Sequence, residues 1–162
     1  MATKLSILVF VASPLDYARY RHTALFFQFD HDAQSQIEHV GNDGSTEGNI
    51  RSSVMEVVGS TGFFSFGERV NWKVPASSTN LARIIPVADI PSTTPISALR
   101  STVASTPIEE SQSGDSDWNS QNWIGDALSR LVATGYLDRQ ARDRSLDAMV
   151  DAVLEAGDEK VS

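Results

Sequence analysis

Short runs of apolar residues fill the first half of the chain, and each run is closed by polar or turn-forming residues. Runs of this kind, rich in β-branched and aromatic residues, are typical of buried strands. The two clearest cover residues 6–12 and residues 22–29. Further strands are expected at residues 36–40, 54–58, 63–66, 70–74 and 82–87, with the third and fourth of these forming a hairpin across Gly67-Glu68.

Farther along the chain, the apolar period changes from that of strands to that of helices. Helices are expected at residues 96–103, 119–133 and 138–156, with Gly135 as the C-terminal cap of the second. Residues three and four apart lie on one face of a helix. In the second helix that face holds Ser120, Trp123, Ile124, Ala127, Leu128 and Leu131. Strands followed by helices predict an α+β domain whose antiparallel sheet packs against the C-terminal helices.

Composition indicates one globular unit. The chain has 162 residues, of which 41% are hydrophobic and 21% charged, values that are ordinary for a folded domain. We therefore expect a single domain over residues 1–162, with a flexible insertion at 41–49, a loop at 108–117 and a tail at 157–162.

The net charge of the chain limits the classes of partner that it can bind. A net charge of −8 disfavours nucleic acid and anionic membrane surfaces, because both require a basic face. The N-terminal apolar run is too short to span a bilayer or to act as a signal peptide, so we expect a cytoplasmic protein that acts on a small molecule. Its oligomeric state is left open.

The chain contains no cysteine, and its three histidines, His22, His31 and His39, all lie in the first quarter of the sequence. The lack of cysteine excludes disulfides, thiolate chemistry and cysteine-type zinc sites. The histidines lack the spacing of a helical metal site. We expect neither a metal nor another cofactor.

The most informative position is Ser120, at the start of the second predicted helix. Free N–H groups and the positive end of the helix dipole stabilise negative charge there, which suits a nucleophile or an anion site. Ser, Asp and Asn are also the ordinary residues that cap a helix. The segment Asp117-Trp118-Asn119-Ser120 is therefore interpreted either as a cap or as part of a site.

Two separated motifs resemble a known superfamily. The strand Tyr20-Arg21-His22-Thr23-Ala24 and the helix entrance Asn119-Ser120-Gln121-Asn122-Trp123 are similar to those of the circularly permuted papain-like proteins. That superfamily includes the lecithin retinol acyltransferase-like and the desumoylating-peptidase-like proteins. Within it, Val58-Gly59-Ser60-Thr61-Gly62 and Trp118-Asn119-Ser120-Gln121 look like motifs of a group of small fungal proteins.

The resemblance implies a role for each matching residue. His22 takes the position of the general base, Ser120 that of the nucleophile, and Tyr20 that of a hydroxyl near the oxyanion. The third, orienting position falls on His39 or on Glu56, depending on which strand is the counterpart. A carboxylate there would stabilise the imidazolium that forms on proton transfer.

Ser120 departs from the superfamily, whose nucleophile is a cysteine, and a hydroxyl is far less acidic than a thiol. Three explanations are open: an engineered replacement of cysteine, a natural serine-type acyl enzyme, or a scaffold that no longer uses a nucleophile.

We expect a small-molecule enzyme with a nucleophile-free cleft between His22 and Ser120, catalysing an isomerisation or cyclisation of fungal secondary metabolism. Residues expected to bind the substrate beside Tyr20, His22 and Ser120 are Gln121, Asn122, Trp123 and Trp72. One alternative is a serine-type acyl hydrolase or acyltransferase that uses Ser120 and His22. Another is a binding module without catalysis.

Overall fold

The computed structural model describes residues 2–12, 16–18, 21–29, 50–59, 63–74, 80–109 and 118–156. Tyr20, His39 and the strand predicted at residues 36–40 lie outside these ranges.

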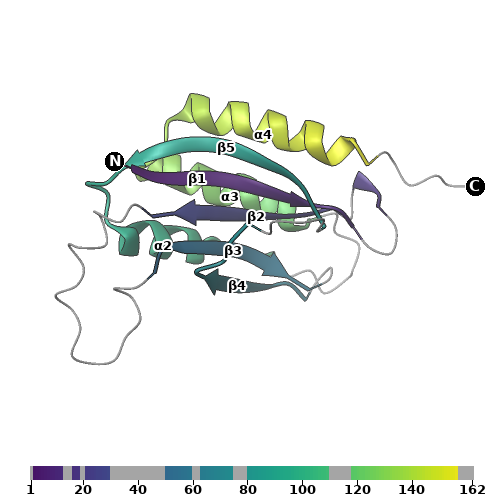
Figure 1. The fold of residues 1–162 in the computed structure, drawn as a ribbon, viewed down its shortest axis with the longest axis horizontal. Coiled ribbons are helices and arrows are strands. Elements are labelled where there is room, and N and C mark those ends of the chain that lie inside the picture. The colour runs from purple at the N-terminus through teal and green to yellow at the C-terminus, as the bar shows by residue number, and fades with distance from the viewer. Residues whose placement is uncertain are drawn as a thin grey trace, which may run out of the picture.

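The described residues form five strands and three helices (Figure 1). The strands make one antiparallel sheet in the order β4-β3-β2-β1-β5. They are β1 (Ala2–Phe10), β2 (His22–Gln28), β3 (Ser52–Val58), β4 (Ser65–Val70) and β5 (Leu81–Pro91). The helices are α2 (Ile96–Ala104), α3 (Ser120–Ala133) and α4 (Arg139–Leu154). This is the α+β arrangement that the sequence predicts.

One face of the sheet packs against α3 and α4. In Figure 1, α3 lies behind β1 and β2, and α4 runs alongside β5 at the top of the view. Its core combines residues of β1, β2 and β3 with the apolar side of α3. The face predicted for α3 is confirmed, because all six of its residues are buried: Ser120, Trp123, Ile124, Ala127, Leu128 and Leu131. We call this side of the sheet the helix face.

The opposite side, here the second face, carries a smaller apolar cluster. Fully or almost fully buried there are Leu8, Ala24, Phe26 and Val54, with Phe10, Trp72 and Leu81 packed against them. The chain leaving β4 turns back over this face. Asn71 N–H donates to the carbonyl of Ser52 at 2.7 Å, and Ser52 Oγ donates to the carbonyl of Trp72, also at 2.7 Å. These bonds place the Trp72 indole over the cluster.

The register assigns each residue of β2 to one of the two faces. Leu25 pairs with Ile7 of β1 and Met55 of β3, and all three belong to the core on the helix face. Successive side chains of a strand point to opposite sides. Thr23 therefore lies on the helix face, two residues before Leu25, and His22 lies on the second face.

The hairpin predicted across Gly67-Glu68 is wrong. β4 runs straight through these residues, and its pairing with β3 continues from Val58↔Ser65 to Ser53↔Val70 without a break. Alternate side chains of β4 point to the helix face, where Phe66 packs against Trp123 and Glu68 forms a hydrogen bond with Arg100 of α2. These contacts explain why the strand stays straight. A turn at Gly67 would remove both contacts.

The other elements predicted within the described ranges occur with shifted ends. β1 begins at Ala2 and ends at Phe10, and β5 continues to Pro91. The helices differ from their predicted bounds by at most two residues at either end. No helix within the described ranges has both the length and the apolar character needed to cross a membrane.

Candidate functional site

His22 and Glu56 form a hydrogen-bonded pair on the second face. His22 is the first residue of β2, and Glu56 lies near the end of the neighbouring strand β3. His22 Nε2 lies 2.9 Å from Glu56 Oε2. The Glu56 side chain is only 11% exposed, whereas the His22 side chain is 33% exposed. A buried carboxylate thus holds an imidazole that remains open to solvent.

Two further side chains extend this pair on opposite sides. The ring of Phe10 on β1 stacks on the His22 imidazole, with centroids 5.8 Å apart and an interplanar angle of 28°. Arg69 on β4 donates from Nη2 to Glu56 Oε2 at 3.3 Å. Its guanidinium lies over Trp72, with Cζ 5.7 Å from the ring centroid. The result is a row of contacts from β1 to the end of β4.

Glu56 is ionised at neutral pH. Its burial alone would raise its pKa, but the hydrogen bond and charge of His22, followed by those of Arg69, outweigh that effect and lower the pKa. A carboxylate can only accept hydrogen bonds, so the proton between the two groups belongs to His22 Nε2. In the neutral imidazole the lone pair is then on Nδ1. Among the described residues, none bonds that nitrogen.

Ser120 lies on the other side of the sheet. Its Oγ accepts hydrogen bonds from Thr23 N–H at 3.1 Å and from Thr23 Oγ1 at 3.2 Å, and the residue is 5% exposed. The described hydrogen bonds therefore pair Ser120 with Thr23 and not with His22. The reason is the pleat of β2, which sends His22 and its neighbour Thr23 to opposite faces.

The polar residues after Ser120 hold the entrance of α3. Gln121 Nε2 donates to the carbonyls of Ala18 and Arg21, at 3.0 and 3.2 Å. Asn122 Oδ1 accepts from the backbone N–H of Asn119 at 3.0 Å and completes a capping box. Both side chains expected to bind substrate therefore have structural partners.

The two tryptophans named as substrate contacts have different surroundings. Trp123 is fully buried on the helix face, with its ring 6.0 Å from that of Phe66. Trp72 lies on the second face and is partly exposed. Of the expected site residues in the described ranges, the structure brings together His22 and Glu56, with Trp72 linked to them through Arg69.

The sequence pattern alone does not mark Arg69 and Phe10 as residues of this site. A period-2 count along each strand places Phe10, His22 and Arg69 on a shared face only after the register between strands is known. Within the described residues, no group of three or more histidine and acidic side chains is arranged to hold a metal ion.

Comparison with known proteins identifies one family. The model of a family of unknown function, DUF6540, matches residues 9–138. Searches of curated proteins and of solved structures find no match. The matched range includes β2, β3, β4 and the whole of the His22–Glu56 pair.

Proposed function

This chain belongs to the DUF6540 family of unknown function, and we propose that it is a small-molecule enzyme that transfers a proton without a protein nucleophile. The reaction class is an isomerisation or cyclisation of an enolisable carbonyl compound. His22 is the proposed acid and base, and Glu56 the residue that positions it. A variant of the permuted papain-like scaffold and a place in fungal secondary metabolism, both implied by the resemblance, belong to the same proposal.

The single observation that carries the proposal is the contact between His22 Nε2 and Glu56 Oε2 at 2.9 Å, with the imidazole one-third exposed. A carboxylate that fixes one ring nitrogen sets the tautomer and stabilises the imidazolium after proton uptake. A histidine in this setting is suited to general acid–base catalysis.

The proposed step balances without a co-reactant. The lone pair of His22 Nδ1 takes a proton from the carbon next to the substrate carbonyl. The C–H bond breaks and its electrons move to the carbonyl oxygen, giving an enolate. The imidazolium then returns the proton to a different carbon, which gives the isomer. In the cyclisation, the enolate carbon instead bonds to a second carbonyl carbon of the same molecule. The π electrons of that carbonyl move to its oxygen, and the imidazolium protonates the resulting alkoxide.

The surroundings of Ser120 favour this reading over a serine-type acyl enzyme. A nucleophilic hydroxyl must donate its proton to a base within hydrogen-bond reach. Ser120 Oγ instead accepts two hydrogen bonds from Thr23 and is almost fully buried. No imidazole among the described residues contacts it.

Deuterium incorporation tests the proposal without knowledge of the natural substrate. A panel of 1,3-diketones, β-keto esters and β,γ-unsaturated ketones is incubated with the protein in D2O and followed by proton NMR. His22→Gln should reduce protein-dependent exchange by about 10²- to 10⁴-fold, the usual contribution of a general base. Glu56→Gln should reduce it less, because the imidazole is kept but less well oriented.

Ser120→Ala is the matched control, since it removes a buried hydroxyl on the opposite face of the sheet. This variant should retain deuterium exchange. A fluorophosphonate probe should label neither the variant nor the parent protein, as judged by intact mass. A stoichiometric adduct on Ser120, or exchange that His22→Gln leaves unchanged, would contradict the proposal. No exchange with any carbon acid would favour a binding module without catalysis.

A further inference from the structure

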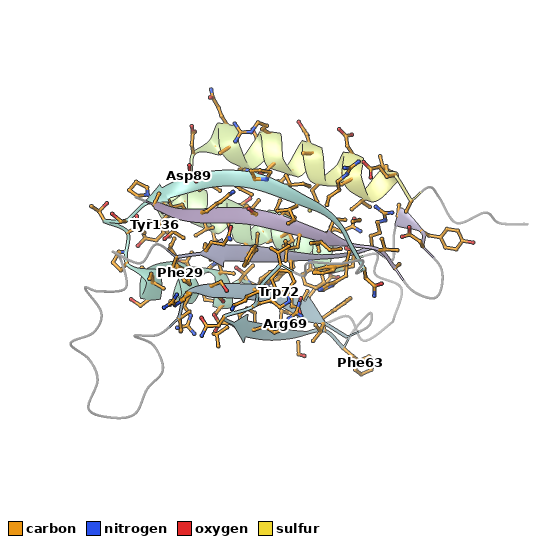
Figure 2. All side chains as sticks on the ribbon, viewed as in Figure 1. Phe29, Phe63, Arg69, Trp72, Asp89 and Tyr136 are labelled. Carbon is orange, nitrogen blue, oxygen red and sulfur yellow. The ribbon has the colours of Figure 1, made fainter. Side chains whose placement is uncertain are left out.

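Arg69 is held beside the His22–Glu56 pair, but the proposed proton transfer does not use it. Its Cα pairs with that of Val54, so its side chain leaves β4 on the second face. Figure 2 shows Arg69 and Trp72 next to each other, and the guanidinium Cζ lies 5.7 Å from the Trp72 ring centroid. A guanidinium between a carboxylate and an indole is pre-oriented.

Most of the hydrogen-bonding capacity of Arg69 is not used by the residues that the structure describes. The guanidinium carries five N–H donors, and within the described part of the chain one contact, Nη2 to Glu56 Oε2 at 3.3 Å, is made. The side chain is 48% exposed. The remaining donors can therefore reach a ligand on the same face as His22.

The local charge favours an anionic ligand despite the acidity of the protein. Arg69 and His22 both contact Oε2 of Glu56, so two groups able to carry positive charge share one negative charge. When His22 holds a proton, the cluster has a surplus positive charge. With a net charge of −8 over the whole chain, anions are repelled in general, and a local cation determines where one can bind.

Aromatic side chains border the cluster on two sides. Phe10 stacks on His22, and Trp72 packs edge-on against Phe26 with ring centroids 5.3 Å apart and an angle of 87°. Both aromatic residues are only partly buried over the apolar cluster of the second face. Sites that combine aromatic walls with a few placed polar groups suit flat, largely apolar ligands.

We propose that Arg69 determines substrate specificity by binding an acidic group, so that the substrate is a planar, conjugated carbonyl compound with a carboxylate or an equally acidic enol. This inference rests on the proposed function and names the substrate class of the same site. Arg69 donates hydrogen bonds to the acidic oxygens, and Trp72 keeps the guanidinium in place. His22 then faces the carbon that loses its proton.

The probe that tests the inference is 2-naphthoate, titrated into 15N-labelled protein, with neutral 2-naphthamide as its partner of equal shape. The naphthoate should bind and shift the Trp72 indole N–H signal, and Arg69→Gln should weaken binding by about tenfold or more, because charge-assisted bonds are lost. Arg69→Lys should retain part of the affinity. Arg83→Gln is the matched control, since Arg83 is 57% exposed, lies on the other face and pairs with Glu155 at 2.9 Å.

Three results would overturn the inference: no binding of 2-naphthoate at millimolar concentration, equal binding of 2-naphthamide, or unchanged binding in Arg69→Gln. The two proposals fail separately. Arg69-dependent binding without His22-dependent exchange would keep the anion site and reject the proton-transfer function. In the opposite case, deuterium exchange would require His22, but Arg69→Gln and the parent protein would have the same KM for acidic carbon acids and the same KM for neutral ones. That result would keep the function and reject the anion site.

Discussion

At the scale of single residues, the side chains of His22 and Thr23 leave β2 in opposite directions, and this separates Ser120 from every described imidazole. Ser120 receives two hydrogen bonds from Thr23 within a buried environment. Those bonds satisfy a backbone N–H that would otherwise be buried without a partner, a loss that costs about 1–3 kcal/mol. The hydroxyl therefore fastens the start of α3 to β2.

Cysteine at position 120 tests this structural role. In a thiol enzyme, an adjacent imidazole lowers the pKa of the thiol and speeds its alkylation. Ser120→Cys should instead react slowly with iodoacetamide at neutral pH, because its neighbours are the hydroxyl and N–H of Thr23 and the site is buried. The rate of alkylation, followed by intact mass, should be the same in Ser120→Cys and in the double variant with His22→Gln.

Denatured Ser120→Cys protein supplies the reference rate for an exposed thiol of the same sequence. The separation of the two residues would be contradicted if the folded variant were alkylated faster than this reference and if replacing His22 lowered that rate. It would restore the pairing that the resemblance to permuted papain-like proteins implies.

At the scale of elements, the apolar period was sufficient to locate the described strands and helices, except for β4. Two apolar runs flank Gly67-Glu68, and glycine is a common turn residue, so local pattern favoured a hairpin. The long pairing with β3 overrides that preference. A contact on the helix face supports the straight strand, because Arg100 of α2 donates to Glu68 from Nε at 2.9 Å and from Nη2 at 2.7 Å.

The candidate site was less predictable than the fold. His22 and Glu56 are separated by 34 positions in the sequence, and their contact depends on the register between β2 and β3. A slip of one residue would move every side chain of a strand to the other face. Tertiary packing fixes that register through pairs such as Leu25 with Met55, which no local pattern reveals. The same dependence on register applies to the predicted pairing of His22 with Ser120.

Two glycines of the described elements should respond oppositely to alanine. Gly59, just after β3, has a φ of +123°, and a Cβ there would clash with the carbonyl oxygen of Phe63. Gly59→Ala should destabilise the protein by more than about 1 kcal/mol, because both the backbone and the contact oppose it. Gly125 lies inside α3 with open space around its Cβ position. Gly125→Ala should stabilise by about 0.5–1 kcal/mol.

Urea unfolding of the two variants, monitored by far-UV circular dichroism, measures both effects under one condition. Each variant is the control for the other, since the chemical change is the same. Equal stabilities, or stabilisation by Gly59→Ala, would show that the chain after β3 does not require the left-handed conformation.

At the scale of the whole molecule, three carboxylates with lowered pKa values connect separate parts of the fold. The hydrogen bond of Arg21, opposed in part by burial, lowers the pKa of Asp16, and Arg21 Nη1 also donates to the carbonyl of Ala152 in α4 at 2.8 Å. The pKa of Glu68 is lowered chiefly by its hydrogen bond with Arg100. Glu56 on the second face is the third. The ionised form of each of these carboxyl groups therefore favours the folded state.

This arrangement predicts acid sensitivity with a definite sign. A carboxyl group whose pKa is lower in the folded than in the unfolded chain contributes stability above its unfolded pKa, about 3.9 for Asp and 4.3 for Glu. That stability is lost as pH falls through the lower, folded pKa. Urea midpoints should therefore be nearly constant from about pH 7 to pH 5 and fall steadily below about pH 4.5. Glu68→Gln should be less stable than the parent at neutral pH and should lose less on acidification.

A matched variant separates this effect from that of net charge. Asp147→Asn removes the same charge from an exposed position on α4, so the relief of self-repulsion in an acidic chain is common to both variants. Its urea midpoint should follow that of the parent protein across the whole range. If the urea midpoints of Glu68→Gln and of the parent fell in parallel as the pH is lowered, the bond between Glu68 and Arg100 would contribute nothing to the loss of stability in acid. In that case Glu56 and Asp16 would remain as the described carboxylates whose lowered pKa values contribute to the loss of stability, and Glu56→Gln should then remove the larger share.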